Sequence, residues 1–240
     1  RCEDGSFVTT SARTSNSAYS HGREGTRMTK PISIEEIDWW RLAQPTTEEL
    51  YLSGGLLVED WPHARQVERL SVQLFEATQP LHQLDEQALR LLKRAAFLHN
   101  AGMMIETRRH HKHSFRLIKG ARLPDFSDEE RFEIACIARY HRRALPSTSH
   151  EEFAALSRQA RQRVSILAAL LRIADALDYS HDGRVLRVVG EKELSDKKSW
   201  VVSLRTRPLA DLDTELEHAH EKADLFEKVF NLKLQFVIQP

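Results

Sequence analysis

Histidine and acidic side chains recur along this chain at intervals of about one helical hairpin. The series comprises His63, His99 with Asn100, the run His110-His111-Lys112-His113, His141 and Asp175. Each member lies in or beside a segment with helical periodicity, so a helical bundle could gather several of these side chains around one cation. Imidazole nitrogen and carboxylate oxygen atoms bind Mn, Fe, Zn or, with more oxygen ligands, Mg. An ion held in this way lowers the pKa of a bound water and polarises a phosphoryl oxygen, which phosphoester hydrolysis requires.

The predicted metal ligands are His63, His99 and Asp175, and the predicted catalytic positions are His99, Asn100 and Asp175. Adjacent helical residues point about 100° apart, so positions 99 and 100 can both face an ion in a groove between helices. Asn100 stands where a carboxylate would complete a four-ligand site, and its neutral carbonyl removes one negative charge. We therefore expect a divalent cation (Mn, Fe, Zn or Mg) to bind weakly. Taken singly, each residue could instead be a partly buried histidine or a capping or ion-paired acid.

Two clusters of basic residues stand beside this series, although Lys+Arg and Asp+Glu are both 35 in the whole chain. The side chains predicted to bind substrate are Arg109, His111, Lys112, His113, His141, Arg142 and Arg143. Guanidinium groups bind phosphate oxygens in pairs, and Lys and His add further donors, which favours polyphosphate or a nucleotide polyphosphate as ligand. The alternative is a solvated helix face whose charge is balanced by Asp125, Asp128, Glu129 and Glu130.

The remaining composition narrows the classes of function. Equal numbers of acidic and basic residues give no reason to expect nucleic acid or a membrane as partner. Cys2 in a polar tail and Cys136 in an apolar helix offer no disulfide framework, which fits the cytoplasm. Gly54-Gly55 lacks the Lys-Ser/Thr of a phosphate-binding loop, and Trp39-Trp40 favours core or interface packing.

Helices are expected to position the series of histidines and acids. Four Ser or Thr residues precede a Glu by three positions, the spacing of a capping box; they are Ser33 with Glu36, Thr46 with Glu49, Ser127 with Glu130 and Ser149 with Glu152. The longest apolar stripe, Leu167 to Leu177, predicts a helix of about 20 residues with Asp175 at the edge of the stripe.

The character of the sequence changes near Gly183. Alternating apolar residues predict strands at 185–189, 200–204 and 232–238, and a charged helix is expected over 211–230. The fold class is therefore mainly α, a helical bundle with a small C-terminal β-β-α-β appendage. The expected organisation is a disordered tail or non-native extension over 1–30, a helical domain over 31–182 and a small α/β extension over 183–240.

Five short motifs follow one another in the chain. They are LHNAG at 98–102, HHKHS at 110–114, LPDFS at 123–127, RYHRRALP at 139–146 and RIADALD at 172–178. In this order they resemble the C-terminal half of the exopolyphosphatase and guanosine pentaphosphate phosphatase family (Ppx/GppA). The resemblance covers roughly residue 46 to the C-terminus, including the appendage.

The resemblance implies an HD-domain-like bundle and, for an active chain, a metal-dependent phosphohydrolase of HD type. In the wider HD superfamily the metal would be held at positions matching His63, His99, 100 and Asp175, and Asn100 departs from that pattern. In full-length members the polyphosphatase chemistry is assigned to two preceding actin-like domains, which we expect this chain to lack.

Three hypotheses stay open. The first is a phosphohydrolase acting on polyphosphate or a nucleotide polyphosphate, in which His141 or Lys112 neutralises charge on the phosphoryl group. The second is a non-catalytic polyanion-binding module with a degenerate metal site. The third is a helical interaction module that forms a homodimer or docks on a separate catalytic chain through Trp39, Trp40 and the appendage strands.

Overall fold

The computed structural model describes residues 45–190 and 198–239. The expected tail over 1–30, the pair Ser33 with Glu36 and the Trp39-Trp40 pair lie outside these residues. The helices are α1 (Thr47–Leu52), α2 (Trp61–Ala77), α3 (Gln79–His82), α4 (Glu86–Leu98), the 3-10 helix η3 (Ala101–Met104), α5 (His110–Gly120), α6 (Asp128–Arg139), α7 (Glu151–Ala154), α8 (Arg158–Ala176), α9 (Asp213–Lys222) and α10 (Asp224–Phe230). The strands are β1 (Val185–Gly190), β2 (Ser199–Thr206) and β3 (Lys233–Gln239). No helix within the described ranges combines the length and hydropathy needed to cross a bilayer.

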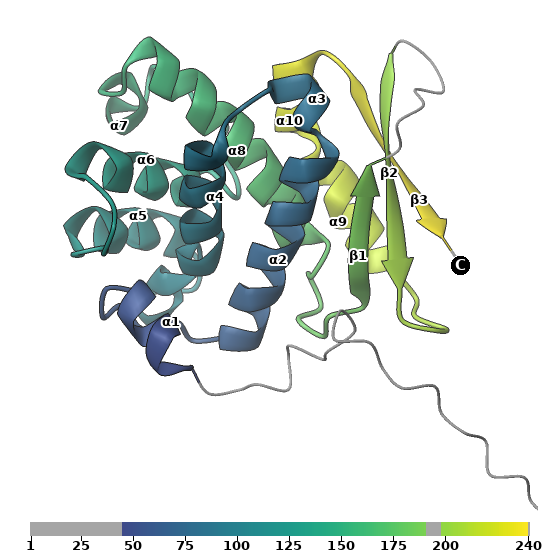
Figure 1. The fold of residues 1–240 in the computed structure, drawn as a ribbon, viewed down its shortest axis with the longest axis horizontal. Coiled ribbons are helices and arrows are strands. Elements are labelled where there is room, and N and C mark those ends of the chain that lie inside the picture. Colours follow the sequence, from purple (N-terminus) through teal and green to yellow (C-terminus); the bar gives the residue numbers. More distant parts are fainter. Residues whose placement is uncertain (1–44, 191–197, 240) are drawn as a thin grey trace, which may run out of the picture. The chain divides into compact units, whose positions relative to one another are not determined.

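Helices α2, α4, α6 and α8 pack against one another at the centre of the bundle (Figure 1). Leu167, Leu170 and Leu171 of α8 are completely buried, and α2 adds Val67 and Leu70 to the same core. The helix predicted from the longest apolar stripe is confirmed, with 19 residues. The mainly α fold class with a small C-terminal sheet is confirmed as well.

Side-chain caps fix where several helices begin. Thr46 with Glu49 and Ser127 with Glu130 each form both hydrogen bonds of a capping box, as predicted. The capping box predicted for Ser149 with Glu152 is wrong: α7 begins at Glu151, and its N-cap residue, His150, makes no side-chain capping hydrogen bond. The Ser147 hydroxyl accepts the backbone amide of Ser149 at 3.2 Å, and the two hydroxyls are hydrogen-bonded to each other at 2.8 Å. This local turn leaves no capping hydroxyl for α7.

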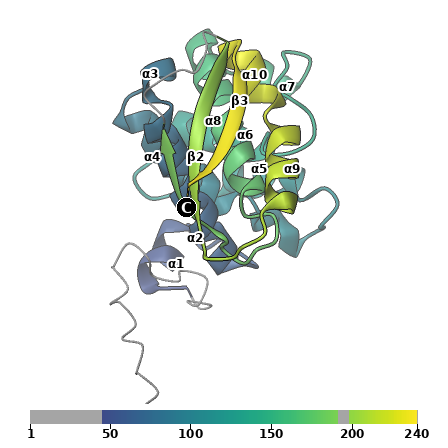
Figure 2. The same cartoon turned by 90° about the vertical axis from the view of Figure 1, so that its right-hand side faces the viewer.

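The C-terminal residues form one small mixed sheet in the order β1-β2-β3 (Figure 2). Strand β1 runs antiparallel to β2, and β3 runs parallel to it, so α9 and α10 provide the crossover that a parallel pair requires. The three predicted strands are confirmed. The helix expected over 211–230 forms two helices that meet at Ala223.

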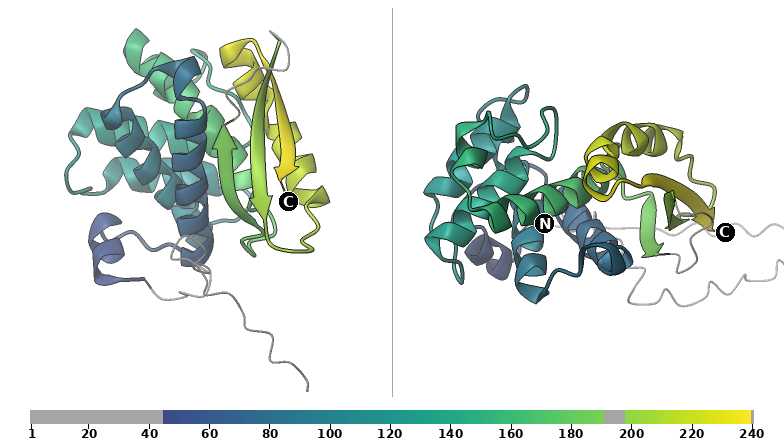
Figure 3. Two further views of the ribbon diagram at one scale, coloured as in Figure 1. Left: turned by 45° about the vertical axis from the view of Figure 1, so that its right-hand side comes forward. Right: turned by 90° about the horizontal axis from the view of Figure 1, so that it is seen from above.

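Polar contacts join the appendage to the bundle. The side-chain amide of Gln66 on α2 donates to the carbonyl of Val185 at 2.7 Å, and Gln73 accepts the amide of Val188 at 2.8 Å. Seen from above, α8 runs from the bundle to α9 and α10 (Figure 3), where Arg172 donates to Asp224 at 2.8 Å. These contacts bring the end of α9 to the residues of α8 that carry the predicted site.

Candidate functional site

Three side chains from three helices converge at the centre of the bundle. His63 projects from the first turn of α2, His99 ends α4 and Asp175 lies near the end of α8. Their ligand atoms all lie within 4.8 Å of one another. Asp175 Oδ1 is 3.4 Å from His63 Nε2 and 3.2 Å from His99 Nε2. The structure thus brings together the three residues predicted as metal ligands.

Hydrogen bonds at the far side of each ring hold the two imidazoles in place. Nδ1 of His63 donates to the buried carboxylate of Asp178 at 2.8 Å, and Nδ1 of His99 donates to the carbonyl of Ala96 at 2.6 Å. When a ring is neutral with its proton on Nδ1, its Nε2 lone pair is available to a cation bound beside Asp175. Such bonds to a carboxylate or a carbonyl orient metal-binding histidines and raise their basicity.

The start of α2 is arranged around His63. Asp60 caps the helix by accepting the amide of His63 at 3.0 Å, and Pro62 occupies the first turn, where a missing N–H costs nothing. The second carboxylate oxygen of Asp60 accepts from Nδ1 of His181 at 2.8 Å. The ring of His181 lies parallel to that of His63, with centroids 3.7 Å apart. Cap and stack together enclose His63, which is buried.

Asn100 follows His99 at the entrance to η3, and its Oδ1 is buried without a hydrogen-bond partner among the described residues. Gly102 lets η3 pack closely against α5, because a Cβ there would lie 2.3 Å from the carbonyl oxygen of His110. Ser114 of α5 donates to the carbonyl of His99 at 2.6 Å and accepts the amide of Gly102 at 2.9 Å. A buried carbonyl oxygen without a donor is costly, and a cation would satisfy it.

A second pair of histidines adjoins the first. Nε2 of His110 lies 3.0 Å from Nε2 of His141, while their Nδ1 atoms lie 2.8 Å and 2.6 Å from the carbonyls of Thr107 and Ala138. With protons on both Nδ1 atoms, the two Nε2 lone pairs face each other. With a proton on Nε2 of His110, that ring donates to His141, and its Nδ1 can accept from Arg142 Nη1, which lies 3.3 Å away. The second arrangement satisfies the pair within the protein, and in the first arrangement the two Nε2 atoms can bind a cation between them.

Burial and ion pairing set the charges of these groups. Burial alone would raise the pKa of the Asp175 carboxyl, but the Lys222 ammonium, 2.5 Å from Oδ2, and the two histidines hold it well below its usual range. Burial also disfavours the His63 imidazolium, but Asp175 and Asp178 outweigh this effect and raise its pKa to about 9. The pKa of His99 is lowered, chiefly by burial.

The second histidine pair is held neutral by the same desolvation. Burial lowers the pKa of His110 to about 4 and that of His141 well below its ordinary value. A shared proton would therefore be held against a substantial desolvation cost, and neutral imidazoles are the form that binds metal.

Asp175 and the histidine pair His110 and His141 line a cavity of about 640 Å³, whereas His63 and His99 are not part of its lining. Its lining includes Asn100, His110, His141, Arg142, Arg143, Arg172, Asp175, Tyr179, His181, His218 and Lys222. Of the residues predicted to bind substrate, His141, Arg142 and Arg143 line this cavity. Arg142 is half-buried and Arg143 exposed, so their guanidinium groups can meet an anion that enters.

The other residues predicted to bind substrate lie at the start of α5, outside the lining of this cavity. Arg109 and Lys112 are exposed at the start of α5, outside the cavity lining. His113 lies 3.3 Å from the carboxylate of Glu106, and His111 is buried with no hydrogen-bond partner for its Nδ1 among the described residues. The structure thus separates these four residues from the cavity that His141, Arg142 and Arg143 line.

Lys222, Asp178 and Arg172 belong to the site, although the sequence patterns did not single them out as site residues. Asp178 follows Asp175 by three positions, and that helical spacing is a signal that could have identified it. Lys222 is one of several charged residues on α9, and only the packing of α9 on α8 brings it to Asp175. Its role could not be found from the sequence.

Residues 57–223, more than half of the chain, match the family model described as Ppx/GppA phosphatase, domain III. The chain belongs to the Ppx/GppA phosphatase family. The resemblance drawn from the five motifs is thereby confirmed for the family's C-terminal region.

Relatives in the Ppx/GppA family include the guanosine-5'-triphosphate,3'-diphosphate pyrophosphatase of Aliivibrio fischeri (strain MJ11), 30% identical over 190 residues, which cover 77% of this chain and 36% of the relative. Proteins of the same name from Vibrio vulnificus (strain YJ016) and Pseudoalteromonas translucida (strain TAC 125) are 29% identical over 170 residues and 36% identical over 98 residues. These matches cover 69% of the chain and 33% of the relative, and 41% and 19%, respectively. The chain thus spans about a third of the length of the relatives it matches most broadly.

Proposed function

We propose that this chain is an HD-like module that binds a nucleotide polyphosphate or polyphosphate and, with a divalent cation, hydrolyses its phosphoanhydride bond. The observation that carries the proposal is the convergence of His63, His99 and Asp175 beneath a cavity lined by Arg142 and Arg143. The relatives named as pyrophosphatases of a guanosine polyphosphate support the ligand class.

The donor set fits a divalent cation. His63 Nε2 is buried without a hydrogen-bond partner among the described residues, and Asn100 Oδ1 shares that condition. His63, His99 and Asp175 would hold the ion, and two imidazoles with one carboxylate suit Mn, Fe or Zn better than Mg. When bound, such an ion supplies the Lewis acidity and the low water pKa that phosphoanhydride hydrolysis requires.

The chain's own cations would bind and orient the phosphates. Arg142 and Arg143 lie where a ligand enters the cavity, and paired N–H donors match phosphate oxygens. Lys222 adds an ammonium group beside Asp175 and can neutralise a phosphoryl oxygen that approaches it. We further propose that Arg109 and Lys112, exposed outside this cavity, attract the distal phosphates of a long ligand.

One observation favours a second function, binding without hydrolysis. Lys222 already neutralises Asp175, and Asn100 withholds the charge of a second carboxylate. A cavity of this kind could retain a polyanion while holding no metal. The two functions differ in whether phosphate is released.

The test is phosphate release from GTP and from tripolyphosphate in the presence of Mn²⁺, measured together with binding of both ligands. The proposed function predicts release that is lost in His63→Gln, while ligand binding persists. The double variant Arg142→Ala, Arg143→Ala should weaken binding and flatten its salt dependence, because two phosphate contacts are removed. A control with the same change in charge is Arg122→Ala, Arg158→Ala, since both side chains are exposed and lie outside the cavity lining. Binding without release would support the second function, and equal binding by both double variants would contradict both functions.

A further inference from the structure

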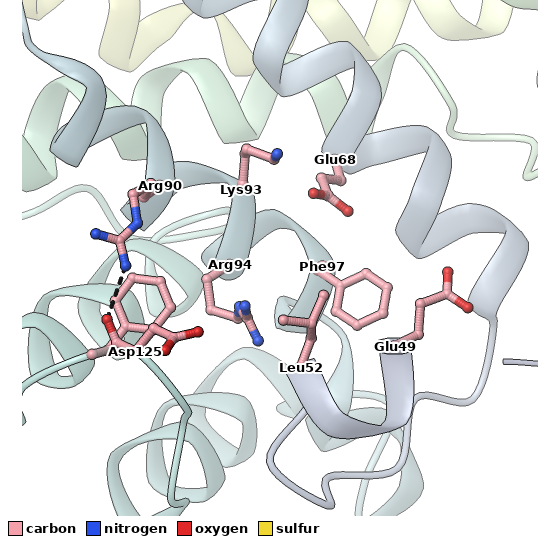
Figure 4. A pocket seen from close by; sticks show the side chains of 9 residues that line it. Glu49, Leu52, Glu68, Arg90, Lys93, Arg94, Phe97 and Asp125 are labelled. Carbon is pink, nitrogen blue, oxygen red and sulfur yellow. Dashed lines mark hydrogen bonds between the residues drawn. The ribbon is translucent and has the colours of Figure 1, made fainter. Parts of the chain in front are cut away.

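A second cavity, of about 230 Å³, opens between α1, α2, α4 and the segment before α6 (Figure 4). It shares no lining residue with the cavity above the metal ligands. Helix α4 supplies Arg90, Lys93, Arg94 and Phe97, a spacing that places all four on one helix face. Three cations on one face of a cavity suggest that it receives an anion.

Arg94 is the group with the clearest need for a ligand. Its Nη1 is buried and has no hydrogen-bond partner among the described residues. Burial lowers the pKa of its guanidinium, and the carboxylates of Glu68 and Asp125 oppose this effect. Figure 4 shows the guanidinium in the middle of the lining side chains, between Asp125 and Leu52. A buried charged donor without an acceptor is destabilising, so an acceptor that enters the cavity would be held well.

The wall of the cavity that faces α4 is already formed without a ligand. Phe126 lies under both arginines, with the guanidinium carbons of Arg90 and Arg94 each 5.2 Å from its ring centroid. Asp125 adopts a left-handed backbone conformation, φ 65°, and its carbonyl accepts from Arg90 at 2.9 Å. A non-glycine residue in this conformation costs about 1 kcal/mol and persists where its surroundings impose it. The aromatic wall therefore does not need to form when a ligand arrives.

The acids around the cavity leave one positive charge unbalanced. Glu49 is committed to Arg65, to which its carboxylate is joined by two hydrogen bonds. Burial raises the pKa of the Glu68 carboxyl, although the charges of Lys93 and Arg94 oppose this effect. Asp125 and Glu68 together thus offset at most two of the three cations of α4.

We propose that this cavity binds a small monocarboxylate whose oxygens accept from Arg94 and Lys93 and whose apolar body rests on Leu52 and Phe97. The single unbalanced charge matches one carboxylate. A phosphate dianion would bring a second negative charge close to Glu68. The volume admits a compact aromatic or aliphatic acid but not a nucleotide.

The test is isothermal titration calorimetry of the full chain with sodium benzoate and with inorganic phosphate as probes. Benzoate should bind, and Arg94→Gln should weaken its affinity at least tenfold, because a charge-assisted hydrogen bond is lost. The matched control Arg122→Gln removes an exposed guanidinium outside the cavity and should leave the affinity unchanged. Glu68→Gln should tighten binding severalfold, because it removes the nearby carboxylate.

Several outcomes would overturn the proposal: no benzoate binding, equal affinity in Arg94→Gln, or tighter binding of phosphate than of benzoate. If Arg94→Gln fails to fold, Glu68→Gln decides, and unchanged or weaker benzoate binding then overturns the proposal. None of these results bears on phosphate release at the metal ligands, since the two cavities share no residue.

Discussion

Replacement of Lys222 by Met should change stability and metal affinity in opposite directions. The ammonium lies 2.5 Å from Asp175 Oδ2, and both side chains are largely buried, with 19% and 14% of their surfaces exposed. Two unit charges about 4 Å apart interact by about 4 kcal/mol near a protein surface, and partial exposure roughly halves that energy. Without metal, Lys222→Met should therefore lower the free energy of unfolding by about 2 kcal/mol at neutral pH. The loss should fade as pH falls through the lowered pKa of Asp175, because the carboxyl is then protonated.

The same substitution, Lys222→Met, should strengthen metal binding. Lys222 competes for Asp175 with any cation at the three ligands, so removal of about 2 kcal/mol of repulsion should tighten Mn²⁺ binding about 30-fold. Calorimetric Mn²⁺ titration and urea unfolding, on wild type and Lys222→Met, measure both effects. Lys228→Met on α10 is the control, because its side chain is exposed. Unchanged or weaker Mn²⁺ affinity in Lys222→Met would refute the assignment of Asp175 as a ligand in competition with Lys222.

Three further predictions concern Asn100 and the burial of His111 and Cys136. Asn100→Asp should raise Mn²⁺ affinity at least tenfold in the same titration, because it restores a carboxylate beside a buried oxygen that lacks a donor; no increase would place residue 100 outside the ligand set. Burial, followed by nearby arginines, lowers the pKa of His111 to about 4, so the unfolded chain binds more protons at this residue, and His111 alone should lower stability by roughly 2.5 kcal/mol from pH 6.5 to pH 4. His111→Gln should flatten that slope in urea unfolding, and an unchanged slope would count against a buried neutral ring. Burial raises the pKa of Cys136 to about 12, so in a Cys2→Ser background iodoacetamide at pH 8 should label it about a thousandfold more slowly than a free thiol, until the protein unfolds. Rapid labelling of the folded protein would contradict that burial.

Local sequence patterns predicted much of the fold. The apolar stripe of α8, the caps at Thr46 and Ser127 and the three strands all follow from interactions between residues near one another in the chain. The cap predicted at Ser149 does not form, and the reason is again local: the Ser149 hydroxyl is hydrogen-bonded to the hydroxyl of Ser147. A spacing rule cannot decide between two short hydrogen bonds of similar strength.

Some residues of the candidate site could be predicted from the sequence, and others could not. His63, His99 and Asp175 were predictable because each lies on a helix of the bundle and their order along the chain matches its hairpins. Lys222 was not, because its position depends on how the appendage packs on α8. The contact between His110 and His141 also appears only when both side chains are placed, since it joins two nitrogen atoms 3.0 Å apart from separate segments of the chain.

Metal content shows whether His63, His99 and Asp175 hold a cation. The measurement is elemental mass spectrometry on tag-free protein, purified without chelator and equilibrated with Mn²⁺, for wild type and for Asp175→Asn. The account predicts at least one Mn, Fe or Zn ion per wild-type chain and a large loss in Asp175→Asn, because the variant lacks the anionic ligand that joins His63 and His99. A wild-type protein without bound metal, or equal metal content in the two proteins, would contradict it.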